Sequence, residues 1–247
     1  MEKNKKTIKT KEKTPIEKKE KEPKVNSLKK EEGGEKKEEG ANKKEIYWII
    51  GVMAFALIAI ALIPMISKQA NTFKYEGLTF TKERFGKIPV FHYYYYTGDA
   101  GKEHRYNIYM RTDPRENNVS VDGEIGYPRI GDVVFVSLNS TAFQKCENVL
   151  REMHTIADFL NGNGYVVKAG NPDENFAKQN NITYVTCKTR PSNMVILITP
   201  GDETKILSND DCQFITVNNC ELLPAIEKFI VKSLIDGKKR SLNSTLS

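Results

Sequence analysis

The first 45 residues contain no arginine and no aromatic residue, and only four of them are Val, Leu or Ile. In their place stand 16 lysines and 11 glutamates, which give this segment a net charge of +5. Such a composition buries too little apolar surface to offset the entropy lost when a chain is ordered. Residues 1–45 are therefore predicted to form a disordered, charged tail.

Residues 46–66 lack charge altogether. A bilayer core of about 30 Å is crossed by about 20 helical residues, so this run fits one crossing. Tyr47 and Trp48 stand at its amino end, where amphipathic rings favour the membrane interface. The run is too long for the apolar region of a cleaved signal peptide. The sequence thus predicts a transmembrane helix at 46–66, with the lipid bilayer as its partner.

Lysines are unevenly distributed around this apolar segment. More of them precede it than follow it closely: Lys36, Lys37, Lys43 and Lys44 on the amino side, and Lys68 and Lys74 on the carboxyl side. Positive residues near a membrane helix favour the cytoplasmic side. We therefore expect an uncleaved signal-anchor in the cell membrane, with a cytoplasmic N-terminus and an extracytoplasmic C-terminal domain.

Cysteine is scarce, and all of it follows the apolar segment, as Cys146, Cys187, Cys212 and Cys220. An even number suits two disulfides in an oxidising compartment, although free thiols or a metal site are alternatives. The absence of a Cys-x-x-Cys pair argues against a zinc ribbon. A straight strand between Cys212 and Cys220 would hold them beyond the roughly 7 Å limit of a bridge. Pairing between distant elements is therefore predicted, such as Cys146 with Cys220.

Four sequons for N-glycosylation also follow the apolar segment, at Asn118, Asn139, Asn181 and Asn243. They predict a glycoprotein only in a eukaryotic or archaeal host.

From residue 46 onward the chain has 22 basic and 21 acidic residues, so it has no basic field. Nucleic acid is therefore not expected as a partner.

The region after a short linker at 67–72 is expected to form one globular domain at 73–237. Strands are predicted at Phe73–Phe80 and Ile88–Thr97. The segment His104–Arg111 alternates between two faces, which predicts a hairpin with one buried face. These segments together predict an antiparallel meander.

The second half of the domain changes pattern. A largely apolar strand at Asp132–Leu138 precedes apolar residues at helical spacing from Phe143 to Leu160, with Thr141 and Gln144 as a capping box. Gly162 ends this helix, and a strand follows at Tyr165–Lys168, which completes a βαβ unit.

Further strands are predicted at Ile182–Cys187, Met194–Thr199, Lys205–Leu207 and Gln213–Val217. A last helix is predicted from Glu221–Pro224 to Gly237, before a polar tail at 238–247. The fold class is α+β, with α/β as the alternative: a mixed sheet with a meander, a βαβ unit and two packed helices.

Candidate binding residues fall at two places. Asn139, Ser140 and Thr141 lie at the carboxyl end of a buried strand, where open α/β sheets bind ligands, but the same residues also suit a helix cap. The run Tyr93–Tyr96 puts two rings on each strand face, and Tyr94 and Tyr96 are the candidate exposed pair. His92 and His104 are a weaker candidate pair across the hairpin.

No catalytic, nucleotide or metal motif is present in the sequence, and no cofactor or metal is predicted. Two functions are therefore considered. One is a membrane-anchored, non-enzymatic module that binds a protein or a surface polymer. The other is a membrane-tethered enzyme, such as a hydrolase using Ser140 near the 138–141 turn or the His92/His104 pair.

Overall fold

The computed structural model describes residues 43–98 and 103–245, except for the side chains of residues 43, 45, 63–70 and 244–245. The tail predicted at 1–45 lies almost entirely outside the described residues. The chain divides into two compact units, residues 1–55 and 56–247.

Helix α1 (Lys43–Ala70) begins in the first unit and ends in the second. Its large apolar side chains are exposed at nearly every position from Ile46 to Leu62. Successive residues are about 100° apart, so the apolar surface runs around the helix. Among the helices described, none is both long and apolar enough over its described residues to cross a membrane. The linker predicted at 67–72 is mostly helical, because α1 continues to Ala70.

The first sheet, sheet A, is an antiparallel meander in the order β1-β2-β3-β4. Its strands are β1 (Thr72–Tyr75), β2 (Leu78–Phe85), β3 (Ile88–Thr97) and β4 (His104–Met110). The single strand predicted at Phe73–Phe80 is instead a hairpin, because Glu76 and Gly77 take φ values of 43° and 83° and reverse the chain. The hairpin of β3 and β4 is confirmed, with one face buried around Ile108 and Met110.

The second sheet, sheet B, is mixed, in the order β5-β9-β10-β8-β6-β7. Its strands are β5 (Ser120–Asp122), β6 (Val133–Leu138), β7 (Val166–Gly170), β8 (Met194–Pro200), β9 (Lys205–Asn209) and β10 (Cys212–Val217). Strands β7, β6, β8 and β10 pair in parallel, and β9 is antiparallel to β10. The mixed α+β class is confirmed, but the strands form two sheets where one was predicted.

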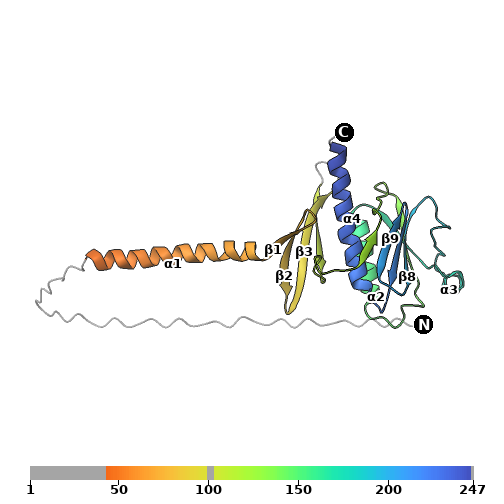
Figure 1. Cartoon of the computed structure of the whole chain (residues 1–247), viewed down its shortest axis with the longest axis horizontal. Helices are drawn as coiled ribbons and strands as arrows, with labels where there is room; N and C mark the ends of the chain where they lie inside the picture. The colour runs from red at the N-terminus through yellow and green to blue at the C-terminus, as the bar shows by residue number, and fades with distance from the viewer. Residues whose placement is uncertain (1–42, 99–102, 246–247) are drawn as a thin grey trace, which may run out of the picture. The chain divides into compact units, whose positions relative to one another are not determined.

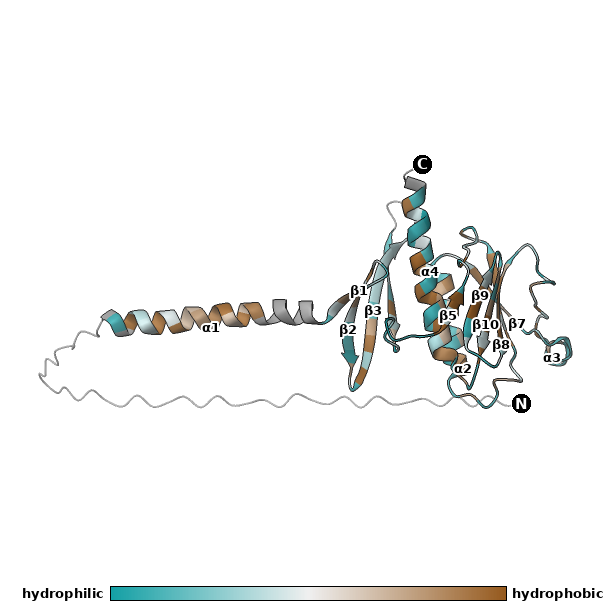
Figure 2. Cartoon of the chain, viewed as in Figure 1, coloured by the Kyte–Doolittle hydropathy of each residue, from teal (hydrophilic) through white to brown (hydrophobic). Residues whose placement is uncertain are grey.

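Two helices lie between the sheets, α2 (Val149–Gly162) and α4 (Leu222–Thr245) (Figure 1). One hydrophobic core joins all three layers, with Phe80 from sheet A, Phe159 and Phe229 from the helices and Ile196 from sheet B. Figure 2 shows apolar residues on the helix and strand faces that point into this core.

The far face of sheet B carries a smaller core of Phe135, Val185 and Val195. The chain between β7 and β8 contributes Val185 and includes the short helix α3 (Glu174–Gln179). The strand predicted at Ile182–Cys187 is not formed: this stretch has only one isolated bridge, between Asn171 and Tyr184. The disulfide of Cys187 and the turn at Thr186–Thr189 direct the chain away from a strand.

Helix α2 begins later than predicted, at Val149. The capping box of Thr141 and Gln144 is not formed, since residues 140–148 form turns. Asn148 caps the helix in a left-handed conformation, with φ 63° and ψ 14°, which is incompatible with a helix interior. A helix from Phe143 would therefore have to pass through a residue that breaks it.

Helix α4 extends past Gly237, where the sequence predicted its end, so the described part of the tail predicted at 238–247 is helical. Lys238 donates a hydrogen bond to the Gly77 carbonyl at 2.7 Å, and Arg240 donates one to the Ile125 carbonyl at 2.8 Å. These contacts hold the last turns on the domain. Gly237 does not end the helix, and a Cβ atom at this position would make an ordinary van der Waals contact with the Tyr127 ring.

Candidate functional site

The outward face of sheet A is rich in exposed aromatic side chains. Strand β3 alternates so that Tyr93 and Tyr95 pack against the core, while Tyr94 and Tyr96 are 48% and 64% exposed. The neighbouring strands add further exposed apolar groups on this side. We call this surface the aromatic face and define it by Phe85, Ile88, His92, Tyr94, Tyr96 and Tyr109.

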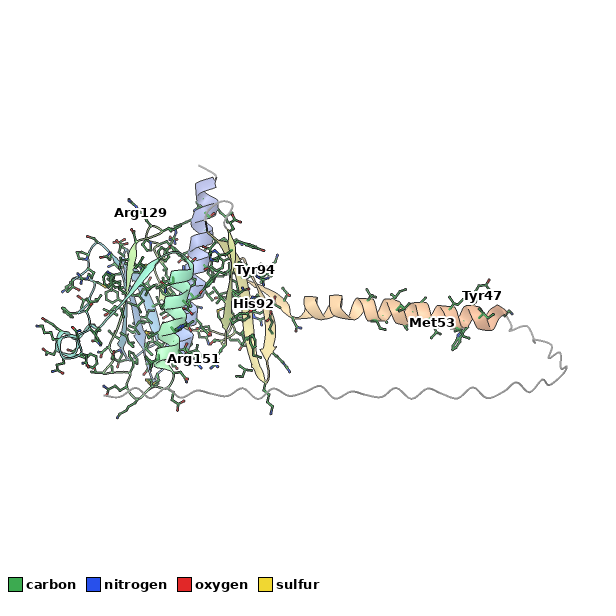
Figure 3. The ribbon with its side chains drawn as sticks, turned by 180° about the vertical axis from the view of Figure 1, so that it is seen from behind. Tyr47, Met53, His92, Tyr94, Arg129 and Arg151 are labelled. Atoms are coloured by element: carbon green, nitrogen blue, oxygen red, sulfur yellow. A yellow bond between two sulfur atoms is a disulfide. The ribbon has the colours of Figure 1, made fainter. Side chains whose placement is uncertain are left out.

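His92 organises the centre of the aromatic face. Its ring nitrogens lie 2.9 Å from Glu83 Oε1 and 3.0 Å from Asn107 Oδ1, so both sides of the ring are held. The ring stacks on Tyr109, with centroids 4.6 Å apart and planes 12° from parallel. Figure 3 labels His92 together with Tyr94 on β3. His92 is therefore a fixed support for the exposed rings.

The predicted pairing of His92 with His104 is wrong. His92 lies opposite Tyr109, whereas His104 lies opposite Thr97, five positions further along β3. An odd separation along a strand also places the two partners on opposite faces of the sheet. The two histidines cannot form one metal or acid–base site.

The exposed rings are held in defined orientations by their neighbours. The Arg105 guanidinium lies 4.0 Å from the centre of the Tyr94 ring. Tyr94 meets Tyr96 edge to face at 6.3 Å. Aromatic rings with a polar tip, next to amide and guanidinium groups, can stack on a ligand and also hydrogen-bond to it. The aromatic face thus has the chemistry of a binding surface.

The predicted site at Asn139–Thr141 lies in the loop after β6, but α2 does not begin there. Thr141 Oγ1 donates to Asn139 Oδ1 at 2.7 Å, and Asn171 Nδ2 donates to Ser140 Oγ at 3.1 Å. The Ser140 hydroxyl also lies 3.4 Å from the Leu138 carbonyl. Within residues 43–98 and 103–245, no histidine or carboxylate is hydrogen-bonded to Ser140. These contacts stabilise the loop and give Ser140 no general base.

Two disulfides are present, as predicted. Cys146 is bonded to Cys220 with Cα atoms 5.4 Å apart, and Cys187 to Cys212 with Cα atoms 5.7 Å apart. The first is the pairing inferred from the sequence. It joins the loop before α2 to the loop before α4, so it connects the two helices of the central layer at their amino ends.

The four sequon asparagines differ in accessibility. Asn118, Asn181 and Asn243 are exposed, while Asn139 is half-buried and its side-chain oxygen accepts the hydrogen bond from Thr141. Over the part of the chain that the structure describes, no three His, Cys, Asp or Glu side chains are grouped to hold a metal ion.

Two further features near the Cys146–Cys220 disulfide were not predicted from the sequence. Glu227 and Glu152 are buried carboxylates on α4 and α2, each 3% exposed. A pocket of about 460 Å³ beside the Cys146–Cys220 disulfide is lined by Arg111 and Lys145, among others. The one local signal was Cys220, which stands two residues before the start of the last helix at Leu222.

Comparison with protein families, with curated proteins and with solved structures finds no match for this chain. Its function is therefore inferred from its own geometry.

Proposed function

We propose that this chain is a single-pass membrane protein whose disulfide-bonded α+β domain is an extracytoplasmic binding or assembly module. The observation that carries the binding part is the aromatic face of sheet A. It presents Tyr94, Tyr96 and Tyr109 to solvent, although a folded domain could hide rings of this size in its core.

The membrane anchor in this proposal is residues 46–66 of helix α1. Its exposed side chains are apolar on every side, whereas a helix lying on a soluble core has one polar face. The sequence is uncharged for 21 residues here, which is the length of one bilayer crossing. Lysines before the segment favour a cytoplasmic N-terminus.

The extracytoplasmic placement of the domain draws support from its cysteines. All four are paired in disulfides, which persist in oxidising compartments and are rare in the cytosol. Three exposed sequon asparagines are compatible with glycosylation on that side.

The partner in this proposal is a protein or a surface polymer that lies flat against sheet A. Glu83 and Arg105, which contact His92 and Tyr94 on this face, carry opposite charges, so we expect stacking and hydrogen bonding to contribute more than charge attraction. Burial of aromatic rings contributes most of the binding energy in many interfaces. The rings fixed by His92 and Arg105 would lose little conformational entropy on binding.

The binding proposal can be tested by crosslinking the full-length protein in its native membranes, followed by mass spectrometry. Wild type is compared with the double variant Tyr94→Ala/Tyr96→Ala and with a matched control, Leu150→Ala. Leu150 is 87% exposed on α2, away from the aromatic face. We expect a partner crosslinked to wild type and to the control, and lost from the double variant. A partner retained by the double variant would contradict the assignment of the face.

The anchor is tested separately, by alkaline extraction of membranes and protease digestion of intact cells. We expect the protein to stay in the membrane pellet and its domain to be digested from outside. Release by alkali would contradict the anchor. Protection of the domain in intact cells would contradict its orientation.

A further inference from the structure

The two disulfides of this domain differ in exposure. Cys220 is exposed to solvent, and its partner Cys146 is half-buried against the core. In the second disulfide, Cys187 and Cys212 are both half-buried. Among the four cysteines, Cys220 is therefore the residue most open to a thiolate from solvent.

The backbone around the exposed disulfide is held in uncommon conformations. Asn219 and Cys220 are consecutive residues in the left-handed region, with φ values of 47° and 63°. Asn148, before α2, also has φ 63°. Such conformations are unfavourable for residues with a side chain, and they cluster at functional sites. The Cys146–Cys220 bond lies between these two loops.

The pockets beside the two disulfides are lined by cations and anions in different proportions. Next to these linings in the sequence, Glu221 follows Cys220 and Lys188 follows Cys187. A pocket of about 460 Å³ includes Cys146 and Cys220 in its lining, with three cations and two anions: Arg111, Lys145, Arg151, Glu147 and Glu152. One of the anions, Glu152, is already paired with Arg151 at 2.6 Å. The pocket beside Cys187 and Cys212 contains one cation and two anions: Arg190, Asp210 and Asp211.

The pocket linings favour a thiolate more at Cys146–Cys220 than at Cys187–Cys212. Cys220 stands two residues before α4, a helix of 24 residues, whose positive end favours negative charge. Cations and a helix amino terminus are the features that activate cysteine thiols in proteins. Asp210 and Asp211, in contrast, repel an approaching thiolate from the second disulfide.

We propose that Cys146–Cys220 is an exchangeable disulfide that reacts with dithiols, while Cys187–Cys212 is structural. A thiolate of the dithiol attacks Cys220 Sγ, the Sγ–Sγ bond breaks, and Cys146 leaves as a thiolate. The second thiol of the dithiol then attacks the other dithiol sulfur, which is bonded to Cys220 in the mixed disulfide, and this releases Cys220 as a thiol. Two electrons and two protons pass to the protein, and the dithiol becomes a disulfide. Nothing in this step depends on the membrane anchor or on the aromatic face.

The experiment uses the full-length protein in detergent and dithiothreitol as the dithiol. Samples are taken over time, trapped with an alkylating reagent, and each cysteine-containing peptide is quantified by mass spectrometry. We expect Cys146 and Cys220 to become alkylated at least about tenfold faster than Cys187 and Cys212, as for an accessible disulfide with a stabilised leaving thiolate. Equal rates, or earlier reduction of Cys187–Cys212, would overturn the proposal.

Charge variants separate activation of the disulfide from simple exposure. Arg111→Gln and Lys145→Gln each remove one cation from the pocket, and each is expected to slow reduction of Cys146–Cys220 by about two- to fivefold. The matched control is Lys188→Gln, which removes an exposed lysine beside Cys187. It should leave the rate at which Cys146–Cys220 is reduced unchanged. Circular dichroism verifies that each variant is folded. A rate that is the same in all three variants and in wild type would overturn the electrostatic part of the proposal.

Discussion

Glu227 Oε1 accepts a hydrogen bond from the backbone N–H of Arg111 at 2.6 Å, although 116 positions separate the two residues. Its second oxygen accepts one from the Thr112 N–H at 2.9 Å. One buried carboxylate on α4 thus holds the chain as it leaves β4, the last strand of sheet A. Helix α4 therefore connects to sheet A through specific polar contacts as well as through the apolar core.

The first prediction concerns the pH dependence of stability at Glu227. Burial raises the pKa of its carboxyl above the ordinary value of 4.5, against the lowering effect of the hydrogen bonds from Thr112 and Arg111. The unfolded chain loses this proton first, so the stability from Glu227 is complete below about pH 4.5 and is lost as pH rises through the folded pKa. In Glu227→Gln, this loss of stability with rising pH should be absent.

The measurement is urea denaturation of wild type and Glu227→Gln at several pH values from 4 to 7.5. The difference between their free energies of unfolding should move in favour of the variant as pH rises. A difference that is constant with pH would contradict the raised pKa. In Glu227→Ala the two N–H groups lose their acceptor, and we expect a loss of about 2–5 kcal/mol at every pH.

The second prediction distinguishes the two sides of β3. The Tyr95 hydroxyl donates to Asn163 Oδ1 at 2.9 Å and accepts from Asn163 Nδ2 at 2.7 Å, on the core side of the strand. Tyr95→Phe should lower the free energy of unfolding by about 1–2 kcal/mol, because a partly buried amide loses its partner. Tyr94→Phe, on the exposed side, should change it by less than about 0.5 kcal/mol. Equal effects in chemical denaturation would contradict the assignment of the two sides.

The placement of these tyrosines was predictable from the sequence, because a strand alternates its side chains with a period of two residues. The same local rule predicted β4, whereas β6 was predicted from a largely apolar run of residues. The period of two also gave the candidate residues Tyr94 and Tyr96, which are exposed, although it could not assign them a ligand.

Other features depend on contacts between distant residues, which no local pattern encodes. Helix α2 was predicted to begin before Cys146, but Asn148 breaks the pattern in a loop that the Cys146–Cys220 bond ties to α4. The pocket beside that disulfide combines Arg111 from the end of β4 with Arg151 from α2. Only the fold brings these residues together, so spacing in the sequence could not identify the pocket.

The third prediction concerns close packing between Gly162 and sheet A. A Cβ atom at Gly162 would overlap the ring of Tyr106, so the ring would have to move. We expect Gly162→Ala to destabilise the domain by about 1–3 kcal/mol. In a Tyr106→Leu background the smaller side chain leaves room, and the cost of the same substitution should fall. A double-mutant cycle by chemical denaturation measures this, and additive effects would contradict the contact.

The last prediction tests the turn that splits the predicted strand into β1 and β2. Glu76 and Gly77 both have positive φ, as in the two-residue hairpins that prefer Asn-Gly. Asparagine tolerates this conformation better than glutamate, so Glu76→Asn should raise the free energy of unfolding by about 0.5 kcal/mol. A Cβ at Gly77 meets only Lys238 Nζ at 3.8 Å, so Gly77→Ala isolates the backbone cost and should lower stability by about 1–2 kcal/mol. In urea denaturation, we expect Glu76→Asn and Gly77→Ala to change the free energy of unfolding in opposite directions. If both substitutions lowered it by similar amounts, the turn would not have this geometry in solution.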